Sequence, residues 1–218
     1  GLGIPAEPLF DLAILFRTTK RAKIEARKDA EQTTLENVLT LKEFEHLREY
    51  AKEHRQDQLY YLMGVLEGSG IRISELKYIT LEAVKRQEAD IINKGKLRKI
   101  PIQDRVKKEL LTYCKEQGIT EGIIFKSRNG NPLDNSYIWR QLQKLAGQVR
   151  SGLKKSKVHP HSFRHLFAKE FINNGGNQLE LADILGHESL ETTRIYTTKS
   201  VAEQRETLNK MSKNRLKG

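Results

Sequence analysis

Cysteine is almost absent from the chain: Cys114 is the single one, so an internal disulfide framework is excluded. A lone cysteine is usually a small buried hydrophobe and is typical of a reducing compartment. Also missing is any apolar run long enough to cross a membrane. These absences exclude a disulfide-rich secreted domain and a helical membrane protein, and they predict a cytoplasmic location.

Acidic residues are missing from one long stretch of the chain, since no Asp or Glu occurs between Asn135 and Lys169. Its cations are Arg140, Lys144, Arg150, Lys154, Lys155, Lys157, Arg164 and Lys169. Over the whole sequence Lys and Arg outnumber Asp and Glu by 39 to 28, for a net charge of +11. Solubility explains part of such an excess, but an acid-free run is typical of a surface that faces phosphates. We therefore expect a polyanionic partner.

The apolar pattern predicts a mainly α-helical chain with a small antiparallel β-sheet, an α+β fold. A capping box at Thr40–Glu43 begins the first predicted helix of the catalytic region. A basic β-hairpin is expected over 88–103, where two β-prone runs flank a lysine-rich turn. Further helical segments are expected over residues 57–67, 71–76, 105–117, 135–149, 160–174, 179–185 and 201–217.

Two finer predictions concern the middle of the chain. Residues 123–125, Ile-Ile-Phe, are apolar and β-prone, which predicts a short strand. Trp139 lies in the helix that Asp134 or Asn135 is expected to cap, and a large aromatic residue there favours a place in the core.

The chemically distinctive residues fit a site that holds one phosphate diester. They are Arg72, the hairpin lysines, His161, Arg164, His187 and Tyr196. A metal site is disfavoured because no Cys pair, His-Glu-x-x-His motif or carboxylate cluster accompanies the histidines. A serine hydrolase would need a Gly-x-Ser-x-Gly turn, which is absent. The cations instead could neutralise a transition-state phosphate without a metal or cofactor.

Tyr196 and a hairpin lysine complete this hypothesis. Nearby cations would favour the phenolate of Tyr196, which makes it a candidate nucleophile. A lysine on the hairpin could protonate the departing sugar oxygen. Taken singly these residues have plainer interpretations: Arg72 and Glu75 could be a weak surface ion pair, and His161 a structural histidine.

Four sequence boxes bring these residues together in one order along the chain. They are Gly70-Ile71-Arg72-Ile73-Ser74-Glu75-Leu76, Pro160-His161-Ser162-Phe163-Arg164-His165, Leu185-Gly186-His187 and Ile195-Tyr196. In order and spacing they resemble the tyrosine recombinase (phage integrase) family, over about residues 38–200. The resemblance implies the catalytic-domain fold of that family and a site-specific DNA recombinase.

The resemblance also implies a role for each matching residue. Arg72 and Arg164 would clamp the scissile phosphate, and Glu75 would support the site. His161 would assist proton transfer, and His187 would hydrogen-bond a phosphate oxygen. Tyr196 would attack to form a 3′-phosphotyrosyl link. The hairpin lysine is matched best by Lys94, but Lys96 stays open because the loop is about one residue shorter than the common family form.

Other basic residues are predicted to contact the DNA backbone: Lys96, Arg98, Lys99, Arg140, Lys144, Lys154, Lys155 and Lys157. We expect residues 1–37 to be a linker or the remnant of an N-terminal core-DNA-binding domain, and 38–200 to be the catalytic domain. Residues 201–218 would form a C-terminal helix or tail that docks on another protomer. The implied partners are double-stranded recombination sites, a homotetramer on paired DNA and an accessory directionality protein, in the bacterial cytoplasm at the nucleoid.

Three alternatives remain open from the sequence. A type IB topoisomerase shares the chemistry but lets the DNA swivel. A catalytically inactive DNA-binding module would carry the same basic surface, although it would not need Tyr196 and Lys94 together. Within the recombinases, integration or excision of a mobile element is the first interpretation, and resolution of chromosome dimers is the second.

Overall fold

The computed structural model describes residues 38–93, 95–149, 152–186, 193 and 205. Contacts divide the chain into Gly1–Val38, of which only Val38 is described, and a compact unit from Leu39 onward. The α-helices are α2 (Leu41–Glu53), α3 (Asp57–Ser69), α4 (Leu81–Arg86), α5 (Asp104–Glu116), α6 (Asn135–Gln148), α7 (Pro160–Asn173) and α8 (Gln178–Leu185). Two 3-10 helices, η1 (Ile73–Tyr78) and η2 (Lys155–Lys157), and two strands, β1 (Glu88–Asn93) and β2 (Lys96–Pro101), complete the described part. The mainly helical fold with a small antiparallel sheet confirms the predicted fold class.

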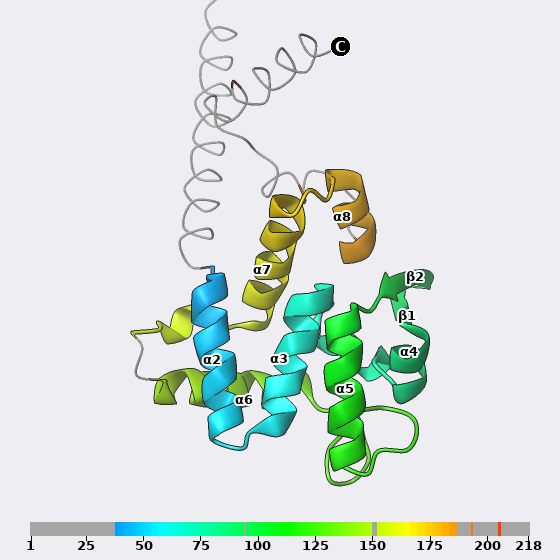
Figure 1. Ribbon diagram of the computed structural model, residues 1–218, viewed down its shortest axis with the longest axis vertical. Coiled ribbons are helices and arrows are strands. Elements are labelled where there is room, and N and C mark those ends of the chain that lie inside the picture. Colours follow the sequence, from blue (N-terminus) through cyan, green and yellow to red (C-terminus); the bar gives the residue numbers. More distant parts are fainter. Residues whose placement is uncertain (1–37, 94, 150–151, 187–192, 194–204, 206–218) are drawn as a thin grey trace, which may run out of the picture. The chain divides into compact units, whose positions relative to one another are not determined.

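Helix α3 is the centre of the core. It packs against α2, α5 and α7, and Figure 1 shows it between α2 and α5. Leu62, Met63 and Leu66 are fully buried, as expected for a helix that is covered on several sides. The predicted capping box at its neighbour α2 is present: the Thr40 hydroxyl accepts from the backbone N–H of Glu43, and the Glu43 carboxylate accepts from that of Thr40.

Gly70 turns the chain out of α3 immediately beside α7. Its φ is +62°, a left-handed conformation that glycine adopts without strain. A Cβ at this position would lie 2.3 Å from Cδ1 of Phe167, so a larger residue does not fit. The glycine therefore lets α3 end against α7, two residues before Arg72.

The predicted hairpin is formed by β1 and β2, which pair with Ile91 opposite Arg98 and Ile92 opposite Leu97. Because side chains alternate between the faces of a strand, the two pairs point in opposite directions. Ile91 is fully buried, whereas Ile92 and Leu97 are 57% and 61% exposed. One face of the hairpin thus packs on the core, and Arg98 lies on that face.

Helix α6 begins after Asp134 as predicted, but its tryptophan does not lie in the core. Ile138, Leu142 and Leu145 form the buried face of the helix, at the i, i+4 and i+7 spacing. Trp139 follows Ile138 by one position, about 100° around the helix axis. It is 47% exposed, so the prediction of a core tryptophan is wrong.

Two other local predictions differ from the structure. Ile123 makes one isolated antiparallel bridge to Thr80, so 123–125 is not a regular strand, although Ile124 and Phe125 are buried. The helix predicted over 71–76 is instead the 3-10 helix η1, which begins at Ile73 and ends at Tyr78. Among the described residues, every helix is too short or too polar to span a bilayer.

Candidate active site

Arg72 is held by the carboxylate of Glu75 at the start of η1. Oε2 of Glu75 accepts from the backbone N–H of Arg72 at 2.7 Å, and Oε1 accepts from its Nη1 at 3.1 Å. The side chain of Glu75 is 5% exposed, while that of Arg72 is 32% exposed. The pair is therefore more than a surface ion pair: a buried carboxylate orients a guanidinium that still reaches solvent.

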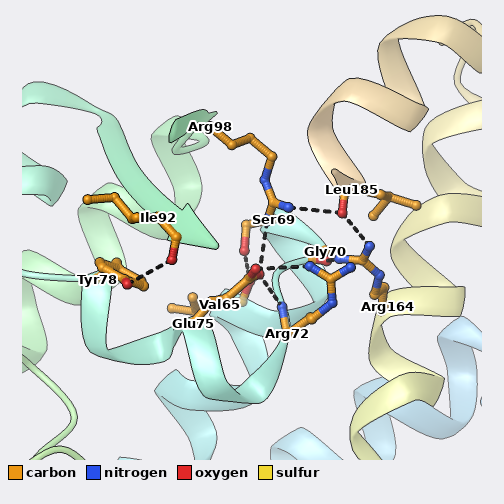
Figure 2. Close-up of polar contacts among 10 residues, drawn as sticks. All are labelled: Val65, Ser69, Gly70, Arg72, Glu75, Tyr78, Ile92, Arg98, Arg164 and Leu185. Atoms are coloured by element: carbon orange, nitrogen blue, oxygen red, sulfur yellow. Dashed lines mark hydrogen bonds and ion pairs between the residues drawn. The ribbon is translucent and has the colours of Figure 1, made fainter. Parts of the chain in front are cut away.

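Arg164 lies on α7 and joins two other elements through their backbone carbonyls. Its Nη1 donates to the carbonyl of Gly70 at 2.7 Å, and its Nη2 donates to the carbonyl of Leu185 at the end of α8. The residue is only 6% exposed. Gly70 precedes Arg72 by two residues, so Arg164 contacts the turn that leads to Arg72, although the two arginines come from distant parts of the sequence (Figure 2).

Arg98 reaches the same place from β2. Its Nη2 donates to Oε2 of Glu75 at 2.9 Å, and its Nη1 donates to the carbonyl of Leu185 at 3.0 Å (Figure 2). Its side chain is 13% exposed. This burial is at odds with the prediction that Arg98 lies on the DNA-facing surface. The alternation of side chains along β2 indicates this inward direction, because Arg98 and the buried Ile100 are two residues apart and share a face of the strand.

His161 lies in the first turn of α7 and is exposed, three residues before Arg164. Pro160 begins this helix at its first position, where the missing N–H has no helical partner to lose. Burial lowers the pKa of the neighbouring His159. It also lowers the pKa of His165 to about 4, and the charges of His161, His159 and Arg164 act in the same direction. His165 is therefore neutral at physiological pH, unlike a phosphate-binding cation.

Lys94, His187 and Tyr196 lie outside the described residues. The chain leading to two of them can be followed as far as Gly186, which ends α8 with φ +62°. The carbonyl just before it, that of Leu185, accepts hydrogen bonds from both Arg98 and Arg164. Leu185, two residues before His187 in the sequence, is thus bonded to two largely buried arginines.

The other predicted DNA-binding residues differ in how they present their charge. Lys96, Lys99, Arg140, Lys144, Lys154 and Lys155 are exposed. Lys99 pairs with Glu88 at 2.6 Å on the surface of the hairpin. Lys157 is turned toward α2, where its Nζ lies 2.9 Å from Oε1 of Glu43 and its side chain is 17% exposed. Lys157 therefore presents less charge to solvent than the prediction assumed.

A histidine with a lowered pKa makes stability depend on pH. The unfolded chain, in which histidine titrates near 6.5, takes up the proton more readily than the folded protein, in which His165 titrates near 4. The free energy of unfolding should then be unaffected by His165 above about pH 7. As the pH falls from 6.5 toward 4, this residue should cost about 2–3 kcal/mol.

Urea unfolding between pH 7.5 and pH 4.5 would measure this contribution, with His165→Asn as the matched variant. The variant carries no titrating group at position 165, so its stability should fall less steeply below about pH 6.5 than that of the wild type. The remaining carboxylates and histidines are common to both proteins and cancel in the difference. Parallel pH curves for the two proteins would contradict the lowered pKa.

Comparison with known proteins agrees with the family resemblance that the sequence motifs indicated. The model of the phage integrase family matches residues 37–203. The tyrosine recombinase XerC of Erythrobacter litoralis is 31% identical over 172 residues, which are 75% of this chain and 55% of the relative. The chain spans about half the length of the curated relatives it matches.

Solved structures share the fold. The XerA recombinase superposes with a TM-score of 0.64 at 27% identity, covering 80% of this chain and 62% of the other. The catalytic domain of bacteriophage HP1 integrase superposes with a TM-score of 0.55 at 24% identity, over 80% of this chain and 96% of the other. The family match covers most of the chain, and the XerC similarity and these folds agree with it. The chain therefore belongs to the phage integrase family of tyrosine recombinases.

Proposed function

We propose that the protein is a site-specific DNA recombinase that cuts and rejoins DNA through a 3′-phosphotyrosyl intermediate. The observation that carries the proposal is the convergence of Arg72 and Arg164. Arg164 donates to the backbone of Gly70, across 94 residues of sequence and two residues before Arg72. A buried carboxylate and fixed carbonyls hold both guanidiniums before any substrate arrives, as electrostatic stabilisation of a phosphoryl transition state requires.

The chemistry follows from the groups assigned to the site. The Tyr196 oxygen attacks phosphorus, a P–O bond to tyrosine forms, and the bond to the 5′ oxygen breaks. His161 assists removal of the phenol proton, and Lys94, or Lys96 in the alternative assignment, protonates the departing 5′ oxygen. Arg72, Arg164 and His187 stabilise the non-bridging oxygens.

The 5′-hydroxyl of a partner strand then attacks the phosphotyrosyl link and releases the tyrosine. Each step replaces one phosphodiester bond by another, so the exchange needs neither a cofactor nor an external energy source. The same reversibility allows strand exchange in one arrangement of DNA ends and simple resealing in another.

The exposed cations supply the proposed DNA-binding surface. Lys96, Arg140, Lys144, Lys154 and Lys155 are exposed and would contact the phosphate backbone. Each phosphate contact should contribute about −0.9 to the slope of the logarithm of affinity against the logarithm of salt concentration. The chain spans about half of its relatives' length, and this slope counts only the phosphate contacts of the residues named here.

The wider setting is part of the proposal. We expect integration or excision of a mobile element in the bacterial cytoplasm, at the nucleoid, by a homotetramer on paired sites and with an accessory directionality protein. Residues 1–37 would be the linker or remnant of a core-DNA-binding domain, 38–200 the catalytic domain, and 201–218 the element that docks on a neighbouring protomer.

Covalent capture would test the proposed function and find the target. The protein is incubated with short random-sequence duplexes that carry a nick, so that the released fragment diffuses away and the protein–DNA link is trapped. SDS-resistant complexes are recovered and the attached DNA is sequenced. We expect enrichment of one sequence, linked through its 3′ phosphate to Tyr196.

The other outcomes separate the alternatives. Binding without any SDS-resistant complex would contradict the proposal and favour an inactive DNA-binding module. Adducts without sequence preference, together with relaxation of a supercoiled plasmid that lacks the selected site, would favour the type IB topoisomerase. Location of the selected sequence at the ends of a mobile element, rather than once per chromosome, would support the proposed setting.

A further inference from the structure

Arg98 completes a closed network of side-chain and backbone contacts at the candidate site. Starting from Arg72, the network passes to Glu75, to Arg98, to the Leu185 carbonyl and to Arg164. It returns through the carbonyl of Gly70, which precedes Arg72 by two residues. Arg98 is the member of this ring that joins the Glu75 carboxylate to the Leu185 carbonyl, and Gly70 closes the ring on the other side (Figure 2).

Resting on the proposed function, we propose that Arg98 is a positioning residue for DNA strand transfer. It fixes the two phosphate-clamping arginines relative to each other and to the end of α8. The guanidinium suits this task because its planar fork presents several donors at fixed angles, so one side chain bridges a carboxylate and a carbonyl. Arg98 itself is largely buried and is not proposed to touch the DNA.

The contacts of Glu75 show why Arg98 matters for the position of Arg72. Its buried carboxylate accepts from the side chains of both Arg72 and Arg98. A buried carboxylate that loses a partner tends to move toward solvent or toward its remaining partner, because an unpaired buried charge is costly. Removing Arg98 should therefore displace Glu75, and with it the guanidinium of Arg72 that Glu75 orients.

Gly186 provides the space that Arg98 occupies. A Cβ added to Gly186 would lie 2.0 Å from Nη1 of Arg98, the atom that donates to the Leu185 carbonyl. Two physical reasons therefore favour glycine in the Leu-Gly-His box. Its φ of +62° ends α8, and its lack of a side chain leaves room for Arg98. The same contact lies one residue before His187, so Arg98 also fixes the point where the segment carrying His187 and Tyr196 leaves α8.

The rest of the environment fits a positioning role. Among the described residues, the buried Nε of Arg98 has no hydrogen-bond partner, and the contacts that hold the side chain there are those of its two Nη groups. The backbone of Arg98 lies opposite Ile91 in the hairpin. The Arg98 side chain thus links the hairpin that carries Lys94 to Glu75 and to the end of α8. Displacements of about 1 Å at a catalytic group can cost about 100-fold in rate.

The experiment compares Arg98→Gln and Arg98→Lys with Arg86→Gln on the duplex selected by covalent capture. Arg86 is a matched control, since it is a neighbouring arginine whose ion pair with Asp90 is exposed. We expect Arg98→Gln to lower the rate of adduct formation about 10- to 100-fold while DNA affinity stays within about 3-fold. Arg98→Lys keeps the charge but lacks the planar guanidinium, so its rate of adduct formation should lie between those of Arg98→Gln and the wild type. Arg86→Gln should match the wild type.

A substrate with a methylphosphonate at the scissile position separates positioning from loss of folded protein. Its phosphorus centre carries no negative charge, so it depends less on the arginine clamp. The defect of Arg98→Gln should therefore shrink on this substrate, whereas a smaller folded fraction would lower both rates equally. If Arg98→Gln fails to fold, the rates of Arg98→Lys on the two substrates are compared in the same way.

The outcomes distinguish this inference from the proposed function. Equal defects on the two substrates, or a wild-type rate for Arg98→Gln, would overturn the positioning role while the wild-type adduct upholds the recombinase. No adduct from the wild type would overturn the proposed function and this inference with it. A double variant with Glu75→Gln adds a further check, because residues that act through one network should show strongly non-additive effects.

Discussion

Replacement of Tyr196 by phenylalanine is expected to abolish the covalent protein–DNA complex. The change removes one oxygen, which is the atom proposed to attack phosphorus, and it leaves the aromatic ring in place. Without a nucleophile the trapped complex should fall by at least about 10⁴-fold. SDS gel electrophoresis of the protein with the selected nicked duplex would measure the complex, and a mobility shift without SDS would show that binding persists.

Tyr137→Phe is the matched control for this substitution. Tyr137 is 40% exposed on α6, so loss of its hydroxyl should change neither folding nor adduct formation. An SDS-resistant complex that survives Tyr196→Phe at the wild-type level would show that another residue is the nucleophile. Peptide mapping of that complex would then identify it.

Replacement of Arg72 by glutamine should produce the second-largest loss. Arg72 is the more exposed of the two clamp arginines, and Glu75 keeps its ion pair with Arg98 in the variant. The fold should therefore survive while the non-bridging phosphate oxygens lose one cationic donor. Loss of one such preorganised donor costs about 10²- to 10³-fold in the rate of the chemical step. Single-turnover adduct formation would measure it.

DNA affinity and a second arginine serve as controls for the Arg72 variant. The dissociation constant should change only a few-fold, because one phosphate contact among many is removed. Arg105→Gln removes an arginine that is 41% exposed in its ion pair with Glu67, and it should leave the rate unchanged. A rate for Arg72→Gln within 3-fold of the wild type would rule out the clamp role.

Local sequence patterns predicted the elements well where one signal dominated. Thr40 and Glu43 form the predicted capping box because both partners lie within a single turn of chain. The pattern of α6 also contained the correct answer for Trp139, since Ile138, Leu142 and Leu145 define a face that excludes it. The error came from giving residue type more weight than helical position.

The candidate site was predictable only in part. The motif order selected Arg72, Glu75, His161 and Arg164 as candidates, and the structure describes all four around the turn from α3 and the start of α7. Arg98 was interpreted as one of several surface cations, because a lysine- and arginine-rich hairpin gives no reason to treat one cation differently. Its inward direction follows from the buried face of the hairpin.

The sequence by itself determined which chemical groups the protein carries, their order, the caps and turns near them, and the family to which the chain belongs. Tertiary structure decided which of these groups share a partner. Arg98 meets Leu185 across 87 residues and Arg164 meets Gly70 across 94, separations over which no helical or strand period carries information. Such contacts depend on how α3, α7, α8 and the hairpin pack together, and that packing is a property of the whole core.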